Sequence, residues 1–142
     1  MSLSNVYSVG LNNVGSYQVS GAPFASGSIN VNSTAKKIEF PYVTKWIQVI
    51  PHTGSADDVK IGFSENGLSG NNYFRLHVTN NQNHQTSYME PMHLKVTELW
   101  LSCDGSDTAS VDVVAGLTNI PVERVTNVSP SGSNWSGSVG VG

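Results

Sequence analysis

A two-residue alternation of apolar and polar side chains constrains this fold more than any other feature of the sequence. In Val59–Phe63 and again in Phe74–Val78, apolar residues occupy every second position, which is the period of a β-strand with one buried face. The same alternation recurs at Ile38–Phe40, Leu94–Val96 and Val111–Val113. No segment of helical length repeats apolar residues at spacings of three and four. The chain is therefore predicted to be all-β.

The spacing of these segments indicates how the strands assemble. The 142 residues correspond to one domain, because that length supports one two-layer core and not two. Shorter strands are expected near Tyr17 and Ile29, and six main strands at Lys36–Phe40, Lys45–Ile50, Asp58–Phe63, Tyr73–Thr79, Met92–Ser102 and Ser110–Leu117. Clusters of Gly, Asn and Ser separate them, as turns require. We expect an antiparallel β-sandwich of the jelly-roll type over residues 35–121.

The N-terminal segment, residues 1–34, leaves two interpretations open. Its apolar side chains, including Tyr7 and Tyr17, are too sparse to bury one another. They would gain most by lying along another surface, as an extended arm does. An ordinary first strand or two explains the same composition equally well.

The C-terminal tail, residues 122–142, is rich in Ser and Gly and is expected not to fold on itself. A linker or disordered end is one interpretation. The other is a tail that docks on a partner, because Trp135, Val139 and Val141 are costly to leave in water.

The alternation changes phase inside one expected strand. Leu94 and Val96 lie on one face, whereas Leu99 and Leu101 lie on the other. A β-bulge near Thr97–Glu98 would restore the phase. Alternatively, both faces of the strand are covered, which would indicate a subunit interface.

Charge and cysteine content exclude several classes of partner. Only 12% of the residues are charged, the net charge is −3, and the seven Lys and Arg residues are scattered, so nucleic acid is not an expected partner. Cys103 is the only cysteine; we expect it to be buried or half-buried, without a disulfide, in a reducing compartment. The start of the chain has no basic and apolar leader pattern, and we expect neither a secretion signal nor a membrane span.

The sequence predicts no catalytic, cofactor or metal site. Its histidines lack metal-ligand spacing: His52, His77, His84 and His93. The acidic loop Asp104–Asp107 has too few oxygen ligands for calcium and is expected to be a hairpin turn. No Ser lies in a nucleophile elbow. A small hydrolase assembled from His77, His93 and Asp58 is the remaining enzymatic alternative, and the chain is predicted not to be an enzyme.

A carbohydrate platform is the remaining binding chemistry. Sugars stack on exposed aromatic rings beside amide and carboxylate groups. Tyr73, Tyr88 and the Asn- and Gln-rich loop at residues 80–85 could supply both.

Three segments carry a resemblance to a known class of proteins: Lys60–Gly67, Glu98–Ser102 and Ala109–Pro121. Over residues 35–121 the chain resembles the small β-sandwich or jelly-roll proteins that decorate or cement the capsids of tailed bacteriophages. The resemblance implies a structural protein on the outer surface of the virion, assembled in the cytoplasm of the bacterial host. It also implies a homo-oligomer, expected to be a homotrimer, that binds between capsomers to the major capsid protein without chemistry.

Four residues are the expected interface in that role: Tyr7, Tyr17, Trp135 and Val139. An extended segment bound along a neighbouring sheet would gain affinity from symmetry and multivalency. The alternative is a carbohydrate-binding or host-adsorption module of a phage head fibre, neck or tail, with Tyr73 and Tyr88 contacting the glycan.

Overall fold

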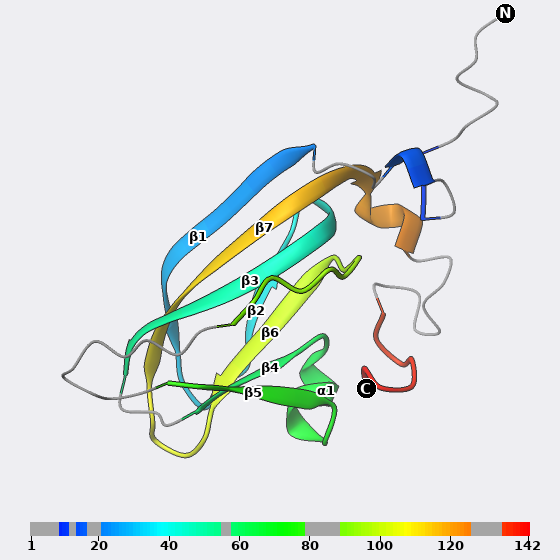
Figure 1. Ribbon diagram of the computed structural model, residues 1–142. Coiled ribbons are helices and arrows are strands. Elements are labelled where there is room, and N and C mark those ends of the chain that lie inside the picture. The colour runs from blue at the N-terminus through cyan, green and yellow to red at the C-terminus, as the bar shows by residue number, and fades with distance from the viewer. Residues whose placement is uncertain (1–8, 12–13, 17–20, 55–57, 79–88, 126–134) are drawn as a thin grey trace, which may run out of the picture.

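The computed structural model describes residues 9–11, 14–16, 21–54, 58–78, 89–125 and 135–142 (Figure 1). Strands account for 53% of the described residues and form two antiparallel sheets there, which confirms the all-β prediction. One sheet has the order β1 (Ala22–Val31), β7 (Ala109–Pro121), β3 (Tyr42–Gly54). The other has the order β2 (Lys36–Glu39), β6 (Glu98–Cys103), β4 (Asp58–Gly62), β5 (Tyr73–His77). Among the described residues, the helices are the short α1 (Glu65–Ser69) and the 3-10 turns η2 (Val14–Ser16) and η3 (Val122–Val125).

The core is built from the inward faces of both sheets. Ile47 and Val113 of the first sheet, and Ile61, Leu99 and Leu101 of the second, have no measurable exposure and belong to one cluster. Each comes from a segment in which apolar residues alternate, because alternate side chains of a strand point to the same face. Hydrophobic burial between the sheets is therefore the main stabilising contribution that this pattern predicts.

The expected strand at residues 92–102 begins only at Glu98. Before that point the chain follows β3 of the other sheet: Ile47 and Met92 exchange backbone hydrogen bonds of 2.9 and 2.8 Å, and the Thr44 amide donates to the Val96 carbonyl at 2.9 Å. The phase change in the sequence thus marks the point, at Thr97, where the chain leaves one sheet and joins the other.

The register of β6 against both neighbours has no shift, so the expected bulge is not found within this strand. Instead, five of its six residues are buried and Trp100 is half-buried. Both faces of the strand are therefore covered, which was the alternative to a bulge. On the side of Glu98 and Trp100 the chain itself contributes the cover, through α1 and Lys37. This burial therefore does not require the subunit interface that the sequence suggested.

A short helix occupies a segment expected to be a turn. Ser64 caps α1: its hydroxyl accepts a hydrogen bond of 2.8 Å from the Gly67 amide, which satisfies one of the free donors at the start of the helix. The helix ends at Gly70. Five residues are too few to display a helical apolar period, which is why the sequence did not reveal it.

The last residues of the chain do fold, contrary to expectation. Residues 135–142 form consecutive turns, with the Val141 amide donating to the Ser138 carbonyl at 3.0 Å. The Ser64 hydroxyl donates to the Val141 carbonyl at 2.7 Å, and the Trp135 indole N–H donates to the Lys95 carbonyl at 2.8 Å. We call residues 135–142 the C-terminal segment. Hydrogen bonds to backbone carbonyls hold this segment of mostly small residues against the rest of the chain. Such contacts leave no periodic apolar pattern in the sequence.

In the N-terminal region, residues 22–31 form β1, paired with β7 on one side, with a register shift between Ser26 and Ile29. Tyr7 and Tyr17 lie outside the described residues. Within the described part of the chain, no helix is long and apolar enough to cross a membrane.

Candidate functional site

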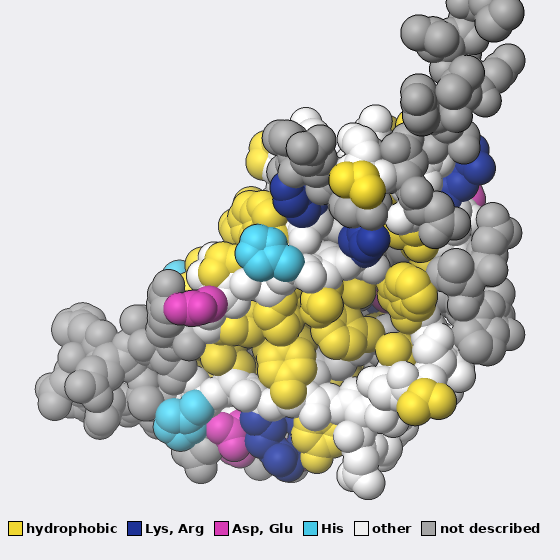
Figure 2. Space-filling view, turned by 45° about the vertical axis from the view of Figure 1, so that its right-hand side comes forward, with side chains coloured by type: hydrophobic (Ala, Val, Ile, Leu, Met, Phe, Trp, Pro, Cys, Tyr) yellow, Lys and Arg dark blue, Asp and Glu magenta, His cyan; other side chains and the backbone are white. Residues whose placement is uncertain are grey.

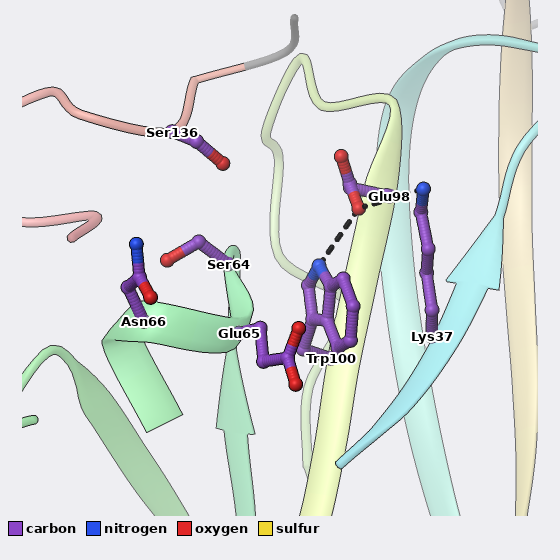
Figure 3. Close-up of a pocket in the computed structure, with 7 residues that line it drawn as sticks. All are labelled: Lys37, Ser64, Glu65, Asn66, Glu98, Trp100 and Ser136. Carbon is purple, nitrogen blue, oxygen red and sulfur yellow. Dashed lines mark hydrogen bonds and ion pairs between the residues drawn. The ribbon is translucent and has the colours of Figure 1, made fainter. Parts of the chain in front are cut away.

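A polar pocket of about 250 Å³ lies on the outer side of the four-stranded sheet (Figure 3). Strands β2 and β6 supply one side of it, the start of α1 supplies the other, and the C-terminal segment adds one hydroxyl. Its lining is Lys37, Ser64, Glu65, Asn66, Glu98, Trp100 and Ser136.

Sheet register places the strand residues of this pocket on one face. Lys37 pairs with Trp100, and Trp100 pairs with Gly62 on the other side, and directly opposed residues in antiparallel strands share a face. Gly62 has no side chain, and Leu68 of α1 fills the space beside it: a Cβ atom at Gly62 would lie 3.1 Å from the Leu68 Cδ2 atom. The glycine thereby lets α1 pack beside Trp100.

A buried carboxylate fixes the indole ring. Glu98 is 7% exposed, and its Oε2 atom accepts a hydrogen bond of 2.7 Å from the Trp100 indole N–H. The Lys37 ammonium lies 3.4 Å from the same oxygen and 5.8 Å from the centroid of the ring. It also contacts Glu39 Oε1 at 2.7 Å. The hydrogen bond to Glu39 is the main cause that raises the pKa of Lys37 above its ordinary value, against the opposing effect of burial.

Three groups of the pocket have no partner among the described residues: the Glu65 carboxylate, the Asn66 side-chain amide and the second oxygen of Glu98, Oε1. No buried side-chain oxygen or nitrogen in the described part of the chain lacks a partner, so the free Glu98 oxygen is open to solvent. The pocket thus presents hydrogen-bonding groups beside one aromatic ring.

An apolar groove of about 410 Å³ lies on the other side of the C-terminal segment. Its lining is Phe63, His93, Leu94, Lys95, Val96, Trp135, Val139, Gly140 and Val141. Figure 2 shows hydrophobic side chains gathered in the middle of one face of the molecule. Several residues that pack at the margin of the core are only partly buried, among them Phe63, Leu94 and Trp135.

The expected interface residues have different environments in the structure. Trp135 packs against the chain's own core, so its ring is largely used within the molecule. Val139 is fully exposed at the groove. Tyr7 and Tyr17 fall outside the described residues.

Of the two expected glycan-binding residues, Tyr88 also falls outside the described residues. Tyr73 lies on β5, and its ring is close to two cations: Lys60 Nζ lies 4.9 Å and Arg75 Cζ 5.1 Å from its centroid. The Arg75 guanidinium also donates to the Tyr73 hydroxyl at 3.2 Å. Cation–π contacts therefore already use this ring, and a sugar would have to displace them.

The residues of the hydrolase alternative meet only in part. His77 Nδ1 lies 3.1 Å from Asp58 Oδ1 across β4 and β5, and His77 is exposed, as its alternation predicts. His93 lies instead at the apolar groove. The three residues do not converge on one cavity.

The acidic loop forms a turn, in which the Asp107 amide donates to the Asp104 carbonyl at 3.1 Å. It is not the expected hairpin, because it joins β6 of one sheet to β7 of the other. A hydrogen bond from Lys60 lowers the pKa of Asp104 below its ordinary value. Cys103 is buried, as predicted, and loss of solvent raises the pKa of its thiol. Across the described ranges, no three His, Cys, Asp or Glu side chains converge as metal ligands.

Sequence reasoning missed a pair of one aspartate and one histidine on the three-stranded sheet. Asp112 of β7 accepts a hydrogen bond of 2.7 Å from the Ser28 amide and pairs with His52 of β3. The Ser28 hydrogen bond is the main cause that lowers the pKa of Asp112 below its ordinary value, and His52 adds to it. Ser28 has a positive φ of 54° at the register shift in β1. The Ser-Gly-Ser turn residues around Gly27 were the only sequence signal of this site.

The polar pocket was also missed, although part of its signal was visible. Glu98 and Trp100 alternate with Leu99 and Leu101, which places them together on the face away from the core. Nothing in the local sequence showed that Lys37, Glu65 and Ser136 would join them.

Comparisons with protein-family models, with curated proteins and with solved structures find no match to this chain.

Proposed function

We propose that this chain is a structural protein of a tailed-bacteriophage virion: a jelly-roll-type β-sandwich that decorates or cements the capsid and performs no chemistry. In this role it lies on the outer surface of the shell, between capsomers, and contacts the major capsid protein as a symmetric homotrimer. The observation that supports the proposal best is the apolar groove beside the C-terminal segment.

The groove has the chemistry of a protein-contact surface. Contiguous exposed apolar surface is uncommon on monomeric proteins and is frequent where another protein binds. Here Leu94, Val96 and Phe63 form apolar walls, and Val139 is fully exposed at the margin. A partner that covers this groove would remove from water the exposed parts of Phe63, Leu94 and Val139, whereas Val96 is already buried.

A symmetric oligomer suits such a small contact. One groove of this size is less than a stable interface needs, but copies held by symmetry bind through several grooves at once. The last strand of the four-stranded sheet, β5, has no strand partner on its outer side among the described residues. Neighbouring copies would also protect such an edge from aggregation.

The mass in solution, measured by light scattering at several concentrations, tests the proposal. We expect a trimer that dissociates when Val139→Asp places a charge at the groove. Val14→Asp is the matched control, because Val14 is 62% exposed and does not line the groove.

Binding to purified phage capsid shells is the second arm. We expect the unmodified protein and the Val14→Asp control to co-sediment with shells, and Val139→Asp to remain in the supernatant. A monomer that binds no shell, or an oligomer and a shell complex that tolerate Val139→Asp, would refute the proposal.

A further inference from the structure

We infer that the polar pocket formed by Lys37, Glu65, Asn66, Glu98, Trp100 and Ser136 is a binding site for a neutral sugar. This assignment concerns a surface different from the apolar groove and does not depend on the assembly role. If it holds, the protein also attaches to a glycan.

The first argument is the combination of groups. A pyranose ring has an apolar C–H face that packs on an aromatic ring and a rim of hydroxyls that donate and accept hydrogen bonds. The pocket offers the half-buried indole of Trp100 beside the free Glu98 oxygen, the Glu65 carboxylate and the Asn66 amide. Figure 3 shows these side chains around a common space, with those of β2 and β6 on one side and those of the α1 region on the other.

The second argument is charge, which selects against ionic ligands. Glu65 and Glu98 line the pocket and Glu39 lies beside it, and these three carboxylates face one ammonium, that of Lys37. Lys37 is already paired with Glu39 and Glu98, so an anionic sugar would meet net negative charge. A ligand cation over Trp100 would compete with the Lys37 ammonium, which is 5.8 Å from the ring centroid. A neutral ligand meets neither penalty.

The third argument is preorganisation and size. The hydrogen bond from the Trp100 indole to Glu98 fixes the plane of the ring before any ligand arrives, so binding costs little side-chain entropy. The cavity, at about 250 Å³, is smaller than the roughly 300–1,000 Å³ of sites for drug-sized ligands. Its size suits a single sugar ring, such as the terminal residue of a longer glycan.

The test uses named probes on the full chain. Methyl glycosides of glucose, galactose, mannose and N-acetylglucosamine are titrated while tryptophan fluorescence and ligand-observed NMR are recorded. Methyl glucuronide serves as the anionic probe. We expect millimolar binding of at least one neutral glycoside and at least tenfold weaker binding of the glucuronide.

Variants locate the site. We expect Trp100→Ala to weaken binding at least tenfold, which corresponds to about 1.4 kcal/mol, and Asn66→Ala and Glu65→Gln to weaken it severalfold. Glu65 and Asn66 are exposed, so their variants test the site even if Trp100→Ala disturbs the fold. Glu90→Gln is the matched control, because Glu90 is exposed and does not line the pocket; it should bind as the unmodified protein does.

Three results would overturn the assignment: no neutral glycoside binding, glucuronide binding at least as tightly, or neutral binding that Asn66→Ala and Glu65→Gln leave unchanged. Light scattering on the same variants separates this outcome from the assembly role, since none of them alters the apolar groove.

Discussion

The polar pocket and the apolar groove beside the C-terminal segment have opposite chemistry, although residues 135–142 contribute side chains to both. On one side Ser136 joins carboxylates, an amide and an indole. The apolar groove, on the other side, is lined by Trp135, Val139 and Val141 together with Phe63 and residues 93–96, which precede the point where the chain passes from one sheet to the other. A short run of turns can serve two surfaces because successive side chains leave a turn in different directions. A segment of low complexity thus becomes informative only once its docking position is known.

Removing the contact that docks the C-terminal segment should take the Ser136 hydroxyl from the polar pocket and one wall from the apolar groove. A Cβ atom at Gly67 would lie 2.8 Å from the Asn72 carbonyl oxygen and still closer to that of Val141, so Gly67→Ala forces the C-terminal segment away from α1. We expect a loss of about 3 kcal/mol in the free energy of unfolding, measured by chemical denaturation, and faster amide exchange in residues 135–142. Gly10→Ala is the control, since a Cβ atom there meets nothing within 4 Å. Equal stability of the two variants would contradict the docked arrangement.

The contribution of the apolar groove can be measured separately from that of the polar pocket by truncating Trp135, the side chain that anchors the C-terminal segment at the groove. Trp135→Ala removes apolar packing against the core and leaves the Lys95 carbonyl without its indole donor. We expect about 2 kcal/mol of destabilisation in thermal or chemical unfolding, less than for a fully buried Trp. Val139→Ser should leave stability nearly unchanged, because Val139 is fully exposed. Comparable losses for the two variants would contradict the distinction between an anchor and an exposed contact.

In the polar pocket, we expect the negative charge of Glu98 to contribute more to stability than the shape of its side chain does. Glu98→Gln keeps an acceptor for the Trp100 indole but removes one of the two carboxylates that stabilise the Lys37 ammonium. We expect about 1 kcal/mol of destabilisation at neutral pH. The pKa of Lys37 is raised in the folded state, so its contribution is complete at neutral pH and is lost as the pH rises above about 10.4. The variant should therefore lose less stability than the unmodified protein as the pH rises above about 10.4, as circular dichroism during denaturation can show.

Substitution of Asp112, which lines neither the polar pocket nor the apolar groove, is expected to have the smallest effect on stability. The pKa of Asp112 is lowered in the folded state, chiefly by the Ser28 amide. Its contribution is therefore present above the unfolded value of about 3.9 and is lost as the pH falls through the folded value. We expect Asp112→Asn to cost at most about 1 kcal/mol at pH 7 and to reduce the loss of stability below pH 4. Binding and oligomeric state should not change, and a change in either would show that the sheets are coupled.

The strands could be predicted from the sequence because a period of two is a local property. Each of the six main segments expected to be extended overlaps an observed strand, and Ile29 lies in β1. The sequence also showed the phase change near Thr97, but not its cause. Leaving one sheet for another is a relation among distant strands, and local alternation cannot distinguish it from a bulge.

The candidate sites could not be predicted because each depends on register or on docking. Lys37 meets Trp100 only because β2 pairs with β6 in one register, and Glu65 arrives on a helix too short to display a period. Trp135 was correctly identified as costly to expose, but its partner is the chain's own Lys95 carbonyl and core. The sequence indicated that Trp135 should be shielded from water without showing which residues it packs against.

The hydrogen bond between Ser64 and Val141 joins residues 77 positions apart. During synthesis at roughly 5–20 residues per second, Ser64 leaves the ribosome several seconds before its partner exists. A nascent or truncated chain that stops short of Val141 cannot form this contact and lacks part of the groove wall. Such products would be distinguishable by surface chemistry alone from a chain that includes Val141, and an assembly or adsorption step that needs these surfaces would admit only chains translated at least that far.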